Sequence, residues 1–306
     1  MLSTDNPYYR QVLLLIEILP LVAKESCFAL KGGTAINLFV RDLPRLSVDI
    51  DLTYVPVEGR EESLARIDES LRRLGAAIER TLRGATAVYH GHGGERLTKL
   101  LVRRGREQVQ IEVSPVMRGS VHAPTSRDVS EAVAEQFGAI RMPVLHSDEL
   151  YAGKLCAALD RQHPRDLFDV MQLQQAEGIS RPLFDVFLVY MLSADRPIAE
   201  MLAPRLAPLS RAFNAEFTGM TLVPVTAEAL EAARKKLIDD LRAMLTDDDK
   251  EFLLAMKRGT PEWRKFAHPQ AELLPAIQWK QRNLERMTPP KRAAALARLE
   301  AVLRGN

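Results

Sequence analysis

Cysteines, aromatic residues and long apolar runs are all scarce in this chain of 306 residues. Cys27 and Cys156 are its only cysteines, too few for a disulfide framework or a cysteine metal site. Both lie in apolar surroundings, so we expect core residues and a reducing, cytoplasmic compartment. No run of about 18 uncharged apolar residues occurs, so we expect no transmembrane helix and no membrane partner. Glu17 and Pro20 interrupt the apolar stretch 12–23, which also lacks the basic start of a signal peptide.

A marked net charge is also lacking. The chain has 42 Lys and Arg against 40 Asp and Glu, so its overall charge indicates no particular partner. Residues 257–306, however, contain eleven Lys and Arg and four Asp and Glu, with Trp263, Phe266 and Trp279 between them. Basic residues interleaved with aromatic rings are typical of nucleic-acid surfaces. A solvated basic helix whose aromatic residues belong to the core fits the same pattern, so both interpretations stay open.

Several catalytic motifs are absent. The sequence has no H-E-x-x-H, no P-loop Gly-Lys-Ser/Thr and no G-x-S-x-G, which disfavours a metalloprotease, a P-loop ATPase and a serine hydrolase. The histidines His90, His92, His122 and His146 show no ligand spacing.

The most informative stretch of the chain is 28–54. A short apolar run ends at Gly32 and Gly33, an apolar-periodic segment covers 35–40, and acidic and apolar residues then alternate over 48–52. This order predicts strand, tight turn, helix and strand. Adjacent glycines let a ligand approach the backbone, and the unpaired N–H groups of a helix that follows them suit a phosphate.

Asp49 and Asp51 alternate with apolar residues on the predicted strand. Side chains at i and i+2 share one face of a strand, so the two carboxylates project together. Their mutual repulsion is relieved by a divalent cation, and Mg²⁺ takes carboxylate and phosphate oxygens. The pair therefore predicts a metal site for phosphate chemistry, although a solvated acidic face fits the alternation too.

Taken together, these residues resemble a known signature. Gly-Gly, a spacer of fifteen residues before Asp49, and the pattern apolar-Asp-apolar-Asp-apolar over 48–52 resemble the motif of the nucleotidyltransferase superfamily. The spacer is slightly longer than usual there. The segments KGGTAINLF and LSVDIDL are most similar to the AbiEii/AbiGii-type toxin family of bacterial nucleotidyltransferases.

The periodicity of the rest of the chain predicts an α+β architecture. A helix is expected over 59–74 with Gly75 as its stop, followed by strands over 85–89, 97–103 and 108–113. We therefore expect a nucleotidyltransferase-fold mixed sheet with helices packed on it, followed by a mainly α-helical C-terminal domain. The expected domains are a catalytic domain over 1–175, preceded by an N-terminal helix, and a helical domain over 176–306 with a basic end.

Glu112 lies between apolar neighbours on the last of these strands. The resemblance implies that it is the third carboxylate of the metal site. A glutamate on a solvent-facing strand fits the sequence equally well.

A second constellation lies on two predicted helices separated by Pro164. Lys154 is a lone lysine among apolar residues, and a snorkelling side chain would account for it. Lys154, Arg161 and the run Arg165-Asp166-Leu167-Phe168-Asp169 also resemble the second signature of the family. That resemblance implies that Lys154 holds a triphosphate and that Asp169 completes the active site. Arg165 joins Gly32, Gly33, Thr34 and Lys154 as a predicted nucleotide-binding residue.

The resemblance implies the toxin of a bacterial toxin–antitoxin or phage-defence system. Such an enzyme would use Mg²⁺ or Mn²⁺ and transfer a nucleotide from an NTP to an RNA acceptor, the tRNA 3′ end, so that translation stops. A cognate antitoxin would be its partner. Two alternatives stay open, which are nucleotide transfer to a protein side chain and a catalytically silent module that binds RNA or antitoxin. Ser47 lies two residues before Asp49, so its phosphorylation would bring negative charge to the pocket, and we predict a regulatory site there.

Overall fold

A computed structural model describes residues 6–92 and 96–305. The chain forms two compact units. The first contains residues up to Leu150 together with Phe217–Pro224, and the second contains Tyr151–Glu216 and the residues from Val225 onward. The division between these units falls inside one helix, and a short later segment returns to the first unit.

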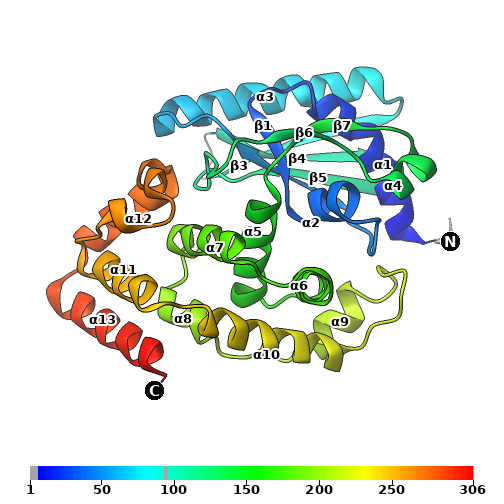
Figure 1. The fold of residues 1–306 in the computed structure, drawn as a ribbon. Coiled ribbons are helices and arrows are strands. Elements are labelled where there is room, and N and C mark those ends of the chain that lie inside the picture. Colours follow the sequence, from blue (N-terminus) through cyan, green and yellow to red (C-terminus); the bar gives the residue numbers. More distant parts are fainter. Residues whose placement is uncertain (1–5, 93–95, 306) are drawn as a thin grey trace. The chain divides into compact units, whose positions relative to one another are not determined.

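A seven-stranded mixed sheet is the centre of the first unit (Figure 1). Its spatial order is β3-β4-β5-β2-β1-β7-β6, in which β2 pairs with β5 and β1 with β7 in parallel and the other neighbours are antiparallel. This is the mixed α+β sheet that the sequence predicts. The strands are β1 (Phe28–Lys31), β2 (Asp49–Tyr54), β3 (Ala85–His92), β4 (Arg96–Arg104), β5 (Glu107–Val113), β6 (Thr125–Asp128) and β7 (Arg141–Val144).

The helices of this unit pack on the sheet through their apolar sides. The long helix α3 contacts β3 and β4, and α1 contacts β5 and β7. The segment after β1 begins as α-helix at Gly32 and continues as a π-helix, so the helix starts at the glycine pair itself. The helices are α1 (Pro7–Val22), α2 (Gly32–Ala35), η1 (Ile36–Val40), α3 (Arg60–Thr81), α4 (Glu131–Phe137) and the start of α5 (Ser147–Asp160).

Gly75 does not end a helix as predicted, because α3 continues to Thr81. A Cβ atom at Gly75 would lie 2.3 Å from the hydroxyl oxygen of Tyr89. The glycine therefore provides close packing against β3.

The loop 41–48 accounts for the long spacer between the glycine pair and Asp49. Its Leu46 N–H donates to the Met220 carbonyl at 2.7 Å, and the Leu222 N–H donates to the Pro44 carbonyl at 3.2 Å. The returning segment Phe217–Pro224 is thus attached to this loop within the first unit.

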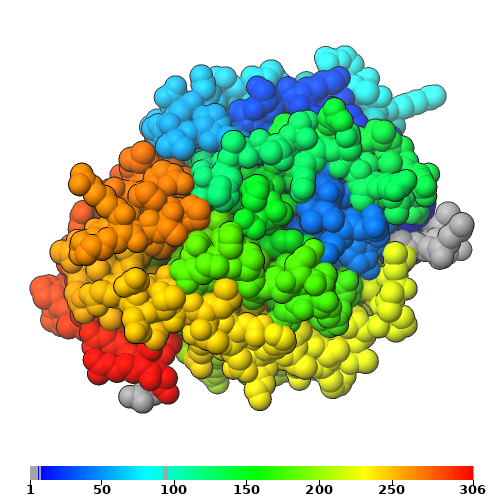
Figure 2. Space-filling model, in the orientation of Figure 1, coloured from blue at the N-terminus to red at the C-terminus, as the bar shows by residue number. Residues whose placement is uncertain are grey.

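Helices make up the described part of the second unit (Figure 1). In this unit α10 packs against α6 and buries Leu230, Leu237 and Leu241, whereas its exposed side is part of the yellow surface in Figure 2. No helix among the described residues is long and apolar enough to span a bilayer. The helices are the rest of α5, α6 (Pro164–Ala176), α7 (Arg181–Ser193), α8 (Ile198–Leu202), α9 (Ser210–Glu216), α10 (Ala227–Ala243), α11 (Asp247–Arg258), η2 (Trp263–Lys265), η3 (Pro269–Leu273), α12 (Pro275–Glu285) and α13 (Pro289–Arg304).

Candidate active-site residues

Three predicted metal ligands share one face of the sheet in the first unit. Strands β2 and β5 run parallel, with Asp49 paired to Gln110 and Asp51 to Glu112. Alternate residues of both strands point into the core, so the carboxylates project from the opposite face. The register therefore brings Glu112 to the strand position beside Asp51.

The carboxylate of Glu112 has protein partners of its own. Lys99 Nζ lies 3.1 Å from Glu112 Oε2, and Gln110 Nε2 donates to the same oxygen at 2.9 Å. The Glu112 side chain is 45% exposed, so these contacts are open to solvent. A cation at this position would compete with the Lys99 ammonium for the carboxylate.

Gly32 lies directly against Asp51. Its φ angle is +73°, and a Cβ atom there would lie 2.3 Å from Asp51 Oδ2. Glycine is thus required for two reasons, because a side chain would be strained at this φ and would also displace the carboxylate. The position ties the glycine turn to the acidic strand.

Gly33 lies against the side chains of the spacer rather than against Asp51. A Cβ atom there would lie 2.6 Å from Arg45 Nη2 and 3.0 Å from Ser47 Oγ. Arg45 is buried and donates through Nη1 to the Leu46 carbonyl at 2.8 Å. The guanidinium of Arg45 therefore packs on the backbone of Gly33. No motif in the sequence identified Arg45, which lies in the spacer between the glycine pair and Asp49.

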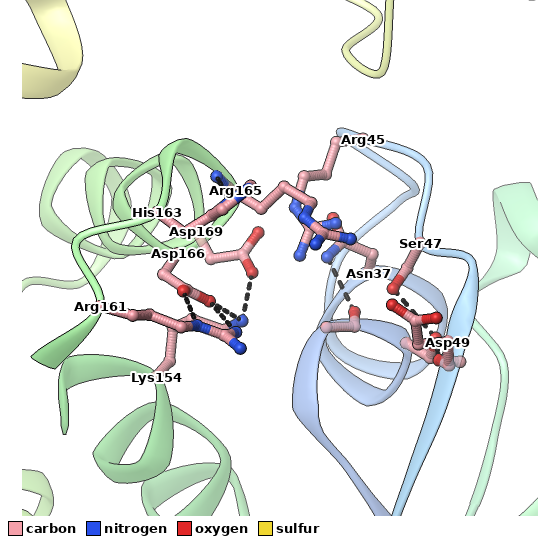
Figure 3. Close-up of polar contacts among 12 residues, drawn as sticks. Asn37, Arg45, Ser47, Asp49, Lys154, Arg161, His163, Arg165, Asp166 and Asp169 are labelled. Atoms are coloured by element: carbon pink, nitrogen blue, oxygen red, sulfur yellow. Dashed lines mark hydrogen bonds and ion pairs between the residues drawn. The ribbon is translucent and has the colours of Figure 1, made fainter. Parts of the chain in front are cut away.

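Thr34 and Ser47 link the turn to β2, and Figure 3 shows Ser47 beside Asp49 of that strand. Thr34 Oγ1 donates to the carbonyl oxygen of Asp49 at 2.5 Å and lies 3.0 Å from Ser47 Oγ. Both side chains are buried. The Thr34 hydroxyl therefore holds the glycine turn against the strand, and its part in nucleotide binding stays a prediction. Phosphorylation of Ser47 requires that this buried contact open.

The donor types on the carboxylate face fit Mg²⁺ or Mn²⁺, because both ions prefer oxygen ligands. Among the described residues, however, only His122, His146 and Asp148 form a group of three with donor atoms all within 4.8 Å of one another. The oxygens of Asp49, Asp51 and Glu112 are therefore not all that close together. Rotation of the side chains would have to bring them onto one ion.

The predicted lysine of the second unit lies in a buried ionic network (Figure 3). Lys154 Nζ is 2.9 Å from Asp166 Oδ1 and 3.0 Å from Asp169 Oδ2. Arg161 donates to both oxygens of Asp166, at 2.6 Å from Nε and 2.9 Å from Nη2. Lys154 is only 6% exposed, so it is a buried, paired cation and not a snorkelling surface lysine.

Asp166 is the most deeply buried carboxylate of this network, and the sequence motif assigned it no role of its own. Burial would raise its pKa, but the Lys154 charge and the Arg161 hydrogen bonds outweigh burial and hold that pKa well below its usual range. Asp166 is therefore ionised at neutral pH. Its i,i+3 spacing from Asp169 lets one ammonium contact both carboxylates.

His163 has a local structural role. Its Nδ1 accepts the backbone N–H of Arg165 at 3.1 Å and so caps the start of α6. Burial lowers the pKa of His163, which favours the neutral ring that can accept this bond. Arg165, a predicted nucleotide-binding residue, follows in the first turn of α6.

The aromatic residues of the basic end divide between core and surface. Trp263 and Phe266 are buried with Phe252, whose ring stacks on Phe266 with centroids 4.3 Å apart. For these two residues the core interpretation is correct, and base stacking is not. Trp279 is 42% exposed, with the Arg282 guanidinium 5.9 Å from its ring centroid.

Comparison with known proteins shows which family the chain resembles. The sequence profile of the family described as "Nucleotidyl transferase AbiEii toxin, Type IV TA system" matches residues 13–283. A search of curated proteins finds no match. Among solved structures the chain is similar to MenT4, a nucleotidyltransferase toxin from Mycobacterium tuberculosis, with a TM-score of 0.63 and 18% sequence identity over 96% of this chain and 93% of that one.

The profile covers most of the chain, including both segments that carry the predicted motifs, and the similarity to MenT4 extends over almost the whole fold. Enzymes of this class generally use nucleoside triphosphates and divalent metals, and toxins of this system have an antitoxin partner. The chain therefore belongs to the AbiEii family of type IV toxin–antitoxin systems, and it is a nucleotidyltransferase.

Proposed function

We propose that this enzyme transfers a nucleotide from an NTP to an RNA acceptor, the 3′ end of tRNA, in a reaction that depends on Mg²⁺ or Mn²⁺. An acceptor hydroxyl attacks the α-phosphorus, the bond between the α- and β-phosphates breaks, and pyrophosphate leaves. The toxin would in this way stop translation until its antitoxin acts, in the cytoplasm and as part of phage defence.

The observation that carries this proposal is the register of β2 and β5, with Asp51 beside Glu112 and Asp49 two residues away. Asp49 and Asp51, with Glu112 once it separates from Lys99, would hold the metal. A bound divalent ion supplies charge neutralisation at the phosphates and activates the attacking oxygen. The residues around it contribute positioning, which is the main requirement of phosphoryl chemistry.

The glycine turn is the proposed triphosphate cradle. Gly32 and Gly33 offer backbone that a phosphate can approach, and Thr34 holds this turn on β2 through the Asp49 carbonyl. This supports a role for all three residues in nucleotide binding, direct for the glycines and through positioning for the Thr34 side chain.

Three residues of the second unit are also assigned to this reaction. Lys154 and Asp169 would be active-site residues, and Arg165 would be a further nucleotide contact. Lys154 already contacts two carboxylates. A triphosphate would therefore share or replace the Asp169 contact, while Asp166 keeps the ammonium in place. This division of roles supports Lys154 as a phosphate ligand that is positioned before the substrate binds.

The test is incubation of purified protein with Mg²⁺, total tRNA and each labelled NTP in turn. Asp51→Asn should abolish labelling of RNA while circular dichroism stays unchanged. Asp42→Asn, which changes an exposed aspartate of the same spacer, should leave labelling intact. Labelling of RNA by Asp51→Asn would contradict the proposal, and labelling of protein instead of RNA would change the acceptor to a protein side chain.

We also propose Ser47 as a regulatory position for this activity. Its Oγ lies 3.0 Å from Thr34 Oγ1 and borders Gly33, so a phosphate there would place about two negative charges in the cradle. Ser47→Asp should lose activity, whereas Ser47→Ala should keep most of it. Full transfer activity of Ser47→Asp would refute the regulatory role.

A further inference from the structure

Two histidines and an aspartate, none of them on β2 or β5, meet in the first unit. His122 lies in the connection between β5 and β6, His146 directly precedes α5, and Asp148 is in its first turn. Their nitrogen and oxygen donor atoms all lie within 4.8 Å of one another. The imidazole rings of His122 and His146 have centroids 4.7 Å apart at an interplanar angle of 52°.

The contacts of His146 bring two acceptors together. Its Nδ1 accepts the backbone N–H of Asp148 at 3.3 Å and also lies 3.4 Å from Asp148 Oδ2. A ring nitrogen that accepts a hydrogen bond has no proton, so Nδ1 cannot donate to the carboxylate. An ion would take the Nδ1 lone pair in place of the 3.3 Å bond from the Asp148 N–H. A cation between these atoms would satisfy both of them.

A buried carboxylate holds the His122 segment at this position. Glu149 is 1% exposed, and its side chain accepts the backbone N–H groups of Val121 at 2.8 Å and His122 at 3.3 Å. These bonds attach the loop to the first turn of α5. The His122 ring is therefore held near His146 and Asp148 without any ion, which reduces the ordering cost of binding one.

The donor set determines which class of ion would bind. Two imidazoles and one carboxylate suit Zn²⁺ and similar divalent transition metals, whereas Mg²⁺ takes oxygen ligands alone. His146 is 42% exposed and Asp148 23%, so an ion can reach the group and water can complete its coordination.

We propose that His122, His146 and Asp148 form a binding site for one Zn²⁺-class ion, made of residues other than the three predicted metal ligands and independent of the proposed transfer reaction. Three protein ligands and one water make a four-coordinate site. The bound ion would link the β5–β6 connection to the start of α5, and Glu149 is the positioning residue of the site.

The experiment uses full-length, tag-free protein carrying Asp49→Asn and Asp51→Asn, which removes the other candidate metal site. Equilibrium dialysis against Zn²⁺, with metal analysis, should give one ion per chain. Titration with Co²⁺ should give the strong visible absorption of a tetrahedral site with nitrogen ligands, which an octahedral site of oxygen ligands lacks.

Variants distinguish this site from adventitious binding. His122→Ala and His146→Ala should each weaken Zn²⁺ binding by at least about 100-fold, more than the 10–100-fold typical of outer-shell partners. Asp148→Asn, a change of nearly equal size, should weaken it as well. His90→Ala removes an exposed histidine of β3 and should leave binding unchanged. Absence of Zn²⁺ binding, or binding that the His122 and His146 variants do not alter, would overturn the proposal.

Discussion

Lys154 Nζ lies 2.9 Å from Oδ1 of Asp166, a carboxylate that solvent does not reach. The same ammonium is 3.0 Å from Asp169, and Arg161 supplies a second cation to Asp166. The two positive charges of Lys154 and Arg161 thus balance the two negative charges of Asp166 and Asp169 within the second unit. Asp166 connects α5 to α6, and this structural role is separable from the catalytic role proposed for Asp169.

Removing the charge of Asp166 should destabilise the protein. Asp166→Asn leaves Lys154 and Arg161 without their shared carboxylate, and breaking a buried ion pair costs about 3–5 kcal/mol. Urea denaturation at pH 7 should show a loss of this size. Asp239→Asn, an exposed change on α10, should stay within about 0.5 kcal/mol of the parent. A similarly small change for Asp166→Asn would mean that the network adds no stability.

The same carboxylate should make stability depend on pH in acid. Its pKa in the folded protein is depressed, so ionised Asp166 stabilises the fold fully above the unfolded-state pKa of about 3.9. That contribution is lost as pH falls below this value toward the folded-state pKa. The difference in unfolding free energy between parent and Asp166→Asn should be constant from pH 7 to about 5 and should shrink below about 4. A difference that shrinks already between pH 7 and 5 would assign the effect to another group.

Alanine substitutions at Gly32 and Gly84 should separate the effect of backbone strain from the effect of a steric clash with Asp51. Both have positive φ angles, +73° and +77°, but a Cβ atom at Gly32 meets Asp51 whereas none at Gly84 meets anything within 4 Å. Alanine at either position should cost about 1–2 kcal/mol of stability through backbone strain. Only Gly32→Ala should also abolish nucleotide transfer. Equal activities of the two variants would show that the contact with Asp51 is not needed.

Substitutions at Lys99 and Glu112 should show whether Glu112 is the third carboxylate ligand of the metal. If Glu112 binds the metal, Lys99 competes with the ion, so Lys99→Met should lower the Mg²⁺ concentration for half-maximal activity and Glu112→Gln should raise it by about 10-fold or more. Glu107→Gln, on the same strand but paired with Arg10, is the matched control. An unchanged Mg²⁺ requirement in both test variants would leave Glu112 as an ordinary surface glutamate.

Gly75 should tolerate alanine only when Tyr89 is removed. The added Cβ would lie 2.3 Å from the Tyr89 hydroxyl oxygen, and overpacking of this kind costs about 1–3 kcal/mol. In a Tyr89→Ala background the same substitution should stabilise α3 by up to about 1 kcal/mol, because alanine favours helix over glycine. Thermal unfolding of the four proteins in the cycle would measure the coupling. Additive effects would contradict the contact.

Local periodicity explains why much of the fold was predictable. The strand–turn–helix–strand order of 28–54 and the strands β3, β4 and β5 follow from alternation and turn residues, which act over short distances. By contrast, β6 and β7 have four residues each, and β7 joins the sheet through a parallel partner more than a hundred residues earlier. Such pairing leaves little local signal. Gly75 shows the same limit, because only the position of Tyr89 separates a packing glycine from a helix stop.

Some residues of the candidate site were also predictable from local sequence, and others were not. A period of two was enough to predict that Asp49 and Asp51 share a face, whereas the register of β5 was needed to bring Glu112 beside them. The positions of Arg45 and Asp166 depend on burial, which their sequence neighbours do not reveal. His122 and His146 are separated by two strands and a helix, so no spacing rule connects them.

The attachment of Phe217–Pro224 to the loop 41–48 has a consequence for biosynthesis. Pro44 and Leu46 bond to Leu222 and Met220, and a ribosome adds those partners only after roughly three quarters of the 306 residues. Domains generally begin to fold as they emerge, but the loop that carries Arg45 and Ser47 cannot acquire this support earlier. The nascent chain therefore gains the support for this loop, which borders the proposed nucleotide cradle, late in synthesis, and a truncated translation product ending before Met220 lacks that support.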